Sequence, residues 1–219
     1  CVLCLTIADN SYMSLDSVSL LFPEKHTQIQ KSMMGMLTLG KVGLPASSAI
    51  GDVKVEGKDY TISFTNDGTK RVLDVHLEDF NGGRPLTAHV ELTDEPRDSM
   101  VIATPFAGHP RHFYYNQKIN CMRASGTVKL GDQQFVFDPS DSFGVLDWGR
   151  GVWTYHNTWY WGSASYKLEN GDTFGWNIGY GFGDCSAASE NMLFHNGKAH
   201  KLSQVKFNIP GGEKDFLSP

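Results

Sequence analysis

Several features that mark common protein classes are missing from this chain. No stretch of Lys and Arg is longer than a dipeptide, and the formal net charge of the 219 residues is -5, so we expect no nucleic-acid partner. No apolar run approaches the roughly 18 residues that a membrane-spanning helix needs, which predicts no transmembrane segment. The chain also lacks the G-x-S-x-G, H-E-x-x-H and Walker motifs of common hydrolases, metalloproteases and nucleotide-binding proteins.

Cysteine is scarce, with four residues in the chain. Cys1 and Cys4 have C-x-x-C spacing, but odd spacing on a strand turns two side chains to opposite faces, and no second pair completes a zinc site. We therefore expect buried thiols, no metal and no cofactor. Such cysteine use favours a reducing compartment, and we expect a cytoplasmic location. The chain begins at Cys1 without Met, so we expect residues to be missing before it and cannot see a signal there.

Glycine and aromatic residues are abundant, and they favour strands joined by tight turns. The chain holds 23 glycines and 12% aromatic residues. Asn-Gly and Asp-Gly pairs separate short apolar runs, as in antiparallel hairpins. We expect an all-β fold, an antiparallel barrel or sandwich. A long loop is expected at 31–51, with one extended stretch at 36–39, and an exposed loop at 109–112, while a polar loop is the structural interpretation of 113–120. The expected strands are residues 2–8 (buried on both faces), 17–22, 53–55, 60–64, 71–77, 86–92, 100–104, 126–130, 133–137, 191–194, 199–202 and 205–209.

All five tryptophans fall between Trp148 and Trp176. If Asn170-Gly171 forms a two-residue hairpin loop, Trp161 pairs with Tyr180 and one sheet face becomes a continuous aromatic wall. This wall is either a plain core face or the lining of a cavity for an apolar ligand. The candidate ligand-binding residues of this segment are Trp148, Trp153, Trp159, Trp161, Trp176, Asn177 and Tyr180.

A set of titratable residues accompanies the tryptophans. Asp147 and Arg150 flank Trp148 between glycines, and they could form either a structural bridge or a general acid with its orienting partner. Proton donation by Asp147 would require it to hold its proton, which the Arg150 charge opposes. His156 and Tyr115 are candidate proton relays, and Lys118 is a further acid–base group. Each of them also has a purely structural interpretation.

Several motifs carry a family resemblance. They are Tyr114-Tyr115-Asn116-Gln117-Lys118-Ile119-Asn120-Cys121-Met122, Phe137-Asp138-Pro139, Asp147-Trp148-Gly149-Arg150-Gly151-Val152-Trp153, Trp159-Tyr160-Trp161-Gly162-Ser163-Ala164-Ser165, Gly179-Tyr180-Gly181-Phe182-Gly183-Asp184 and Glu190-Asn191-Met192. The chain resembles the DUF2804 family over nearly its whole length. That family is distantly similar to lipocalin-like two-barrel proteins, which include carotenoid hydratases and fungal cyclases. The resemblance implies a lipocalin-like fold and a fragment of a two-barrel protein, but it transfers no catalytic residue.

These observations lead to one main hypothesis and two alternatives. We expect residues 1–110 to form part of one lipocalin-like barrel and residues 111–219 to lead into a second, truncated one. The main hypothesis is that the protein binds an apolar lipid, isoprenoid or polyene, with or without acid-catalysed hydration, isomerisation or cyclisation at a carbon–carbon double bond. The alternatives are a non-catalytic β domain that contacts a missing domain or flank, and a carbohydrate-binding module.

Overall fold

The computed structural model describes residues 1–186 and 188–208, and its regular structure is almost entirely strand. One short 3₁₀ helix, η1 (Pro23–Lys25), interrupts the strands. No helix within the described residues has the length and apolar character needed to cross a membrane. The strands are β1 (Val2–Asp9), β2 (Met13–Phe22), β3 (Thr27–Met36), β4 (Val53–Glu56), β5 (Tyr60–Asn66), β6 (Arg71–Asn81), β7 (Arg84–Thr93), β8 (Met100–Phe106), β9 (His109–Leu130), β10 (Gln133–Phe137), β11 (Phe143–Val152), β12 (Tyr160–Lys167), β13 (Thr173–Tyr180), β14 (Met192–His195) and β15 (Lys198–Lys201).

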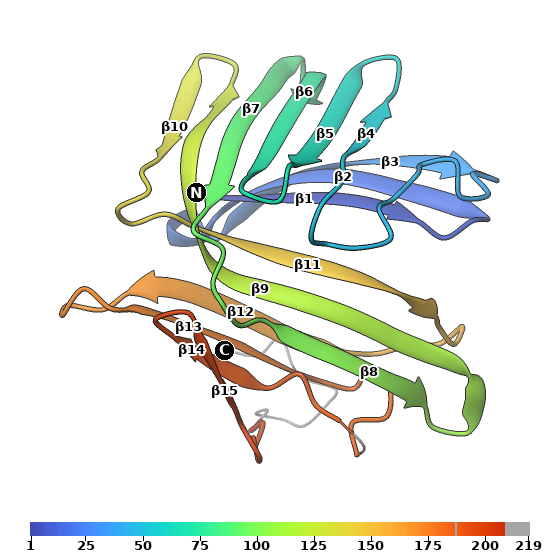
Figure 1. Cartoon of the computed structure of the whole chain (residues 1–219). Coiled ribbons are helices and arrows are strands. Elements are labelled where there is room, and N and C mark those ends of the chain that lie inside the picture. Colours follow the sequence, from blue (N-terminus) through green and yellow to red (C-terminus); the bar gives the residue numbers. More distant parts are fainter. Residues whose placement is uncertain (187, 209–219) are drawn as a thin grey trace. The chain divides into compact units, whose positions relative to one another are not determined.

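The strands form three sheets whose recorded pairings are antiparallel (Figure 1). One sheet has the order β1-β2-β3 and another has the order β12-β13-β14-β15. The largest has the order β10-β9-β7-β6-β5-β4, with β8 and β11 also paired to β9. The expected all-β antiparallel class is confirmed, and none of these sheets closes into a barrel over the part of the chain that is described.

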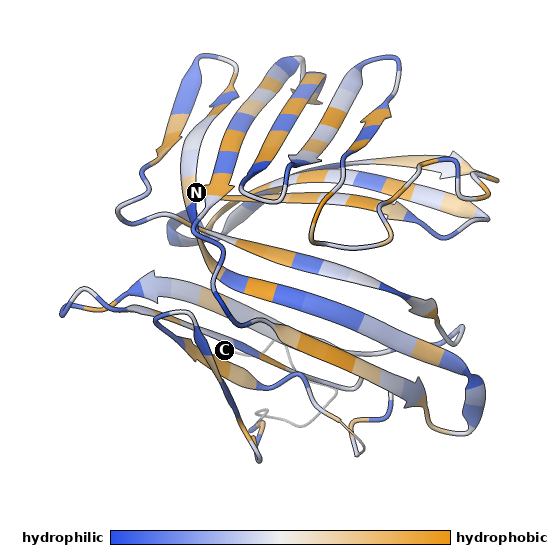
Figure 2. Cartoon of the chain, in the orientation of Figure 1, coloured by the Kyte–Doolittle hydropathy of each residue, from blue (hydrophilic) through white to orange (hydrophobic). Residues whose placement is uncertain are grey.

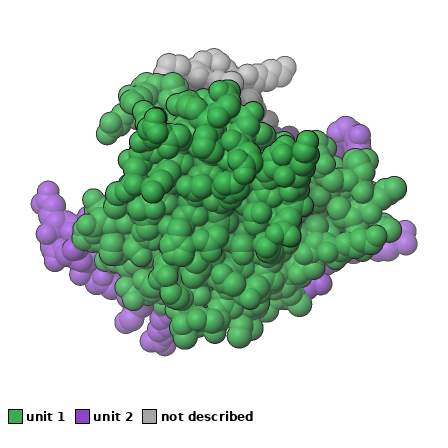
Figure 3. Space-filling model, turned by 90° about the horizontal axis from the view of Figure 1, so that it is seen from above, with its two compact units in different colours: residues 1–96, 121–145 green, residues 97–120, 146–219 purple. Residues whose placement is uncertain are grey.

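The chain divides into two compact units, which Figure 3 shows in different colours. Unit 1 comprises residues 1–96 and 121–145, and unit 2 comprises residues 97–120 and 146–219. The 22-residue strand β9 therefore contributes residues 109–120 to unit 2 and 121–130 to unit 1. The sequence analysis expects a boundary after residue 110 between two barrels of a longer protein. The division into two compact units does not test that boundary, so it stays a prediction.

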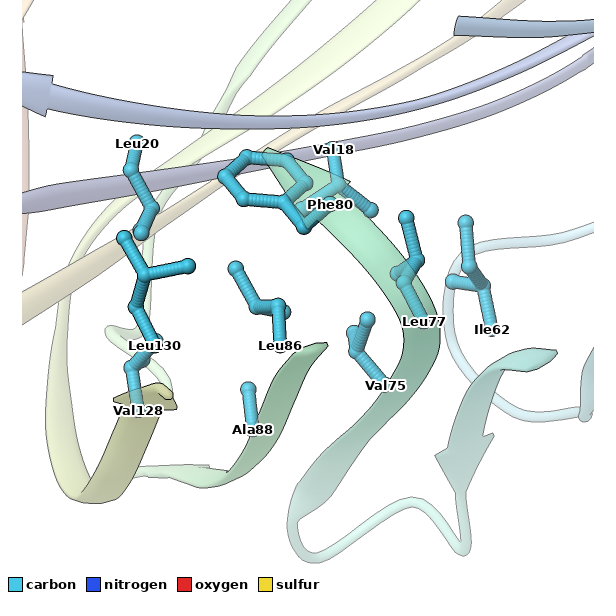
Figure 4. Packing of buried hydrophobic residues seen from close by; sticks show 10 residues of the cluster. All are labelled: Val18, Leu20, Ile62, Val75, Leu77, Phe80, Leu86, Ala88, Val128 and Leu130. Carbon is cyan, nitrogen blue, oxygen red and sulfur yellow. The ribbon is translucent and has the colours of Figure 1, made fainter. Parts of the chain in front are cut away.

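Unit 1 has an aliphatic core built by strands with two-residue periodicity. Alternate residues of β6 and β7 are buried, and Figure 2 shows the corresponding hydrophobic bands on both strands. This pattern places one face of each strand inward, as a half-buried sheet requires. Figure 4 shows the side chains of this core, which come from β2 and from the larger sheet: Val18, Leu20, Ile62, Val75, Leu77, Phe80, Leu86, Ala88, Val128 and Leu130.

Turn chemistry accounts for the hairpins that the sequence predicts correctly. Asn196 and Gly197 join β14 to β15, and both have positive φ angles, 47° and 77°. Asn and Gly adopt this conformation more readily than other residues, so this pair specifies a tight two-residue turn. Gly82 and Gly83, between β6 and β7, also have positive φ angles.

Three expectations about local structure are wrong. Residues 31–36 belong to β3, and residues 109–120 belong to β9, although both were expected in loops. Residues 205–208 form no strand, and residue 209 lies outside the described residues. In residues 109–120, polar residues occupy strand positions that usually show apolar alternation, which explains why this part of β9 was missed.

Burial was also misjudged at the N-terminus. In β1 the even-numbered residues 2, 4 and 6 are exposed and the odd-numbered residues are half-buried, so the strand is not buried on both faces. Cys1, Cys4 and Cys185 are exposed, and Cys121 alone among the four cysteines is buried. The expectation of buried thiols at Cys1 and Cys4 is therefore wrong.

Candidate functional site

The β12–β13 hairpin has a different register from the predicted one. Trp161 pairs with Gly179 rather than with Tyr180, and the connection spans residues 168–172. A one-residue change of register moves every side chain of one strand to the other face of its partner. Trp161 and Trp176 therefore lie on opposite faces, and the continuous aromatic wall is wrong.

The hairpin instead has one aromatic face and one polar face. Tyr160, Tyr166, Phe174, Trp176 and Tyr180 share the aromatic face. The rings of Tyr160 and Tyr180 stack with centroids 4.9 Å apart. A Cβ atom placed on Gly162 would lie 3.1 Å from the Trp176 ring, so this ring covers a cross-strand glycine. The opposite face carries Trp161, Ser163, Ser165, Gly175, Asn177 and Gly179.

The polar face of the hairpin is hydrogen-bonded to β9 inside unit 2. Asn120 donates to Ser163 Oγ at 2.6 Å and to the Trp176 carbonyl at 3.2 Å. Asn120, Lys118, Asn116 and Tyr114 alternate along β9 and share one face, since side chains two apart on a strand point the same way. All four are buried. The interior of unit 2 is therefore lined by polar groups from two sheets.

Lys118 is the centre of this interior. Its Nζ lies 2.7 Å from Asp147 Oδ2 and 3.6 Å from Glu190 Oε2. The same atom lies 4.4 Å from the centroid of the Trp161 ring, which is a cation–π contact. The Lys118 side chain is 4% exposed and that of Asp147 is 46% exposed. The cation is thus buried, while solvent reaches the carboxylate with which it pairs.

Asn177 fixes the ring that covers Lys118. Trp161 Nε1 donates to Asn177 Oδ1 at 2.7 Å, and Asn177 Nδ2 donates to the Glu190 carbonyl at 2.8 Å and to Glu190 Oε2 at 3.2 Å. A Cβ atom on Gly179 would lie 2.7 Å from Glu190 Oε1. The glycine leaves room for the buried carboxylate, which explains this part of the glycine-rich sequence.

Two buried amide oxygens of this network lack a partner. Asn116 Nδ2 donates to Asp147 Oδ1 at 2.7 Å, but Asn116 Oδ1 and Asn120 Oδ1 accept no hydrogen bond from the described residues. Each unpartnered buried acceptor costs about 1–3 kcal/mol. Native proteins contain few such atoms, and each of these two acceptors can take a hydrogen bond from a bound donor.

An aromatic cluster adjoins the polar network. Phe182 is its hub, and the rings of Tyr114, Phe106, Trp153 and Trp159 meet it edge-on at centroid distances of 4.7, 5.3, 5.3 and 5.4 Å. We call these five residues the Phe182 cluster. Phe106 and Tyr114 are buried, whereas Trp153 and Trp159 are 48% and 59% exposed. The cluster therefore extends from the interior of unit 2 to solvent.

Two glycines and strand β8 position Phe182. Gly181 and Gly183 have φ angles of 94° and 74°, which other residues rarely adopt. Cβ atoms there would lie 2.7 Å from the Thr158 carbonyl and 2.5 Å from Thr104. Thr104 Oγ1 donates to the Asp184 carbonyl at 2.9 Å and attaches the turn to β8. The local backbone thus turns the Phe182 ring onto β8 and β9.

Tyr114 connects the two parts of the site. Its ring packs on Phe182. Because Tyr114 lies two residues before Asn116 on β9, both side chains are on the same face of the strand. Burial, with smaller contributions from the charges of Glu190 and Asp147, raises the pKa of Tyr114 well above its usual range. The hydroxyl therefore stays neutral at physiological pH, and it can donate a proton in a hydrogen bond.

The structure does not bring all predicted catalytic residues together. Asp147 pairs with Lys118 and Asn116, whereas the exposed Arg150 lies three positions further along β11. The proposed Asp147–Arg150 pair is therefore replaced by Asp147–Lys118. His156 is exposed in the segment after β11, where its ring meets that of Tyr155.

Tyr115 and Trp148 contact each other away from the polar interior. Their rings meet edge-on at 5.8 Å. Because neighbouring strand residues point to opposite faces, both are turned away from the face that carries Asn116 and Asp147. Of the predicted ligand-binding residues, Trp153, Trp159, Trp161 and Asn177 lie in the site, while the Trp176 and Tyr180 side chains lie on the other hairpin face.

Sequence reasoning missed Glu190 and the amides of β9 as site residues. The two-residue spacing of Tyr114, Asn116, Lys118 and Asn120 is the signal that could have shown a polar strand face. No comparable sequence pattern identifies Glu190, because this residue precedes β14 and reaches the site only through tertiary packing. Among the described residues, no group of three or more His, Cys, Asp or Glu side chains could hold a metal ion.

The fold and the site define an antiparallel β protein whose second unit encloses a lysine–carboxylate centre next to an aromatic cluster. The chain belongs to the DUF2804 family, a domain of unknown function, whose profile matches residues 1–219. Comparison with curated proteins and with solved structures finds no match.

Proposed function

We propose that unit 2 binds a small, mainly apolar organic molecule. The Phe182 cluster would hold the apolar part, and the Lys118 centre would face its polar end. One observation carries the proposal: two half-exposed indole rings, Trp153 and Trp159, adjoin a buried charged network that has unpartnered acceptors. Binding sites combine apolar walls with a few fixed polar groups in this way.

The ion pair bears on the chemistry that such a site could perform. Asp147 Oδ2 accepts a hydrogen bond from Lys118 Nζ, and the buried Tyr114 side chain shares the face of β9 that carries Lys118. The candidates for the acid that the sequence assigns to Asp147 therefore include the Lys118 ammonium and the Tyr114 hydroxyl. Our proposal is for binding, and proton transfer to a carbon–carbon double bond is a secondary hypothesis that depends on it.

Native mass spectrometry of the protein purified from its own host tests the proposal, followed by organic extraction of the released molecule. We expect a co-purifying apolar molecule of defined mass. Titration of the emptied protein with fatty acids and isoprenoids, followed by tryptophan fluorescence, provides the affinity. An empty protein that binds neither class would contradict the proposal and would favour a protein-interaction surface at the exposed tryptophans.

A matched pair of variants locates the site. Trp159→Ala removes a 59%-exposed ring of the Phe182 cluster, and Tyr12→Ala removes a 63%-exposed ring in unit 1. We expect Trp159→Ala to weaken binding roughly tenfold, because losing the apolar contact area of a large side chain costs about 1.5 kcal/mol. Tyr12→Ala should leave the affinity unchanged. Equal affinities in both variants would place the ligand elsewhere.

A further inference from the structure

We propose that the polar end of the ligand is a neutral hydroxyl group, which donates a hydrogen bond to Asn116 Oδ1. The inference rests on the proposed function and narrows its ligand class to apolar alcohols. It depends on the orientation of one buried amide, on its place between the two parts of the site and on the charge balance around it.

The orientation of the Asn116 amide is set by its neighbour. A carboxylate only accepts hydrogen bonds, so the contact of 2.7 Å with Asp147 Oδ1 requires the NH₂ group of Asn116 on that side. The trigonal geometry of the amide then carries Oδ1 away from Asp147. Ile102, the residue directly opposite Asn116 on β8, has no side-chain donor to offer. Asn116 is 4% exposed, so this oxygen is a buried acceptor without a partner.

The position of Asn116 fits the head group of an apolar molecule. On the shared face of β9 it lies between Tyr114, which packs on Phe182, and Lys118, which pairs with Asp147. Successive residues on one strand face are about 7 Å apart. A ligand whose apolar part contacts the Phe182 cluster can therefore place a terminal hydroxyl beside Asn116 without entering the charged centre.

The charge balance of the centre disfavours an ionised head group. Lys118 Nζ pairs with both carboxylates, Asp147 and Glu190, and a second ammonium group, Lys201 Nζ, is held next to Glu190 by hydrogen bonds to the carbonyl and the hydroxyl of Ser189. An added ammonium or carboxylate would bring an unmatched charge next to a buried network, which costs free energy. A hydroxyl supplies the missing donor without adding charge.

Four ligands with the same C₁₀ isoprenoid body test the inference on the unmodified protein: geraniol, geranyl methyl ether, geranylamine and geranic acid. Isothermal titration calorimetry at pH 7 measures each affinity. We expect geraniol to bind roughly tenfold or more tightly than the ether, which cannot donate a hydrogen bond, and more tightly than either charged analogue. Equal binding of all four would overturn the hydroxyl inference and leave the proposed function standing. Failure of all four to bind would overturn the hydroxyl inference, and the proposed function would fall with it only if the fatty acids and other isoprenoids of the fluorescence titration fail to bind too.

Two variants on β9 then test the role of Asn116. Asn116→Leu removes the amide oxygen at similar volume, and Gln117→Leu removes an amide from the other face of the same strand. We expect Asn116→Leu to bring the affinities for geraniol and its methyl ether within about twofold of each other, while Gln117→Leu keeps the wild-type ratio. A preference for geraniol that persists in folded Asn116→Leu would assign the hydroxyl to another acceptor and overturn the inference.

Discussion

The interiors of the two units differ in chemistry although both are enclosed by antiparallel strands. Unit 1 is filled by ten buried apolar side chains of one cluster. At the inward positions of its part of β9, unit 2 has Asn116, Lys118 and Asn120. Asn120 contacts Ser163 of the other sheet, and Lys118 contacts Glu190, which precedes β14. Apolar packing stabilises a fold, whereas a buried ion pair with unpartnered acceptors stabilises it little or not at all. This difference supports our proposal that unit 1 serves as scaffold and that unit 2 retains its polar interior for binding.

The largest effect on stability is expected in the apolar interior. Leu77→Ala in unit 1 removes a fully buried side chain and leaves a cavity, so we expect a loss of about 3–4 kcal/mol in the free energy of unfolding. Urea unfolding followed by far-UV circular dichroism measures it. Affinity for the ligand of folded Leu77→Ala should remain that of the wild type. A loss below about 1 kcal/mol would contradict the description of this core.

Removing the buried cation should have a smaller effect on stability and a larger one on binding. Lys118→Met leaves Asp147 and Glu190 without their shared partner, and we expect a loss of about 2–3 kcal/mol, since Asp147 is partly solvated. All five tryptophans are in unit 2. Tryptophan fluorescence during urea unfolding should therefore report the change in the unfolding midpoint of unit 2 directly. An unchanged midpoint would show that the ion pair is energetically irrelevant.

The turn that positions Phe182 should be sensitive to a single methyl group. Gly181→Ala introduces a Cβ atom 2.7 Å from the Thr158 carbonyl at a φ angle of 94°. We expect a loss of about 1–2 kcal/mol and weaker ligand binding, because the hub of the aromatic cluster is displaced. The control is Gly171→Ala, which has a similar φ of 90° but open space around the added atom. It should cost about 1 kcal/mol and leave binding intact.

The smallest effect concerns the one carboxyl group in the interior of unit 1. Burial raises the pKa of Asp16 above its ordinary value of 3.8, and the hydrogen bond from Tyr60 offsets part of this. The protonated form is therefore favoured in the folded state, and its contribution to stability is complete below pH 3.8 and lost as the pH rises through the raised pKa. We expect Asp16→Asn to be relatively more stable at pH 7 than at pH 3. Urea unfolding at both pH values measures this difference, and an opposite sign would contradict it.

The sequence predicts the scaffold better than the site. Apolar alternation in β6 and β7 and the Asn196-Gly197 turn identify their strands because local patterning and tertiary structure agree there. The polar face of β9 breaks this agreement, so residues 109–120 were assigned to a loop. Asp147, Trp161 and Asn177 were nevertheless predicted as candidates from their neighbourhood in the sequence. Their partners Lys118 and Glu190 lie 29 and 43 residues from Asp147, and no local pattern encodes these contacts.

The most direct test replaces the charged centre while keeping its shape. The triple variant Lys118→Met, Asp147→Asn and Glu190→Gln removes the three charges that meet at Lys118 Nζ. The free energy of unfolding and the affinity for geraniol are measured on the same protein. Our account predicts a stability within about 1 kcal/mol of the wild type, since a buried ion pair can be replaced without loss. It also predicts binding weakened at least tenfold, because Asp147→Asn removes the carboxylate that orients the Asn116 amide. A triple variant that is strongly destabilised, or one that binds geraniol as the wild type does, would contradict the claim that unit 2 retains its polar interior for binding.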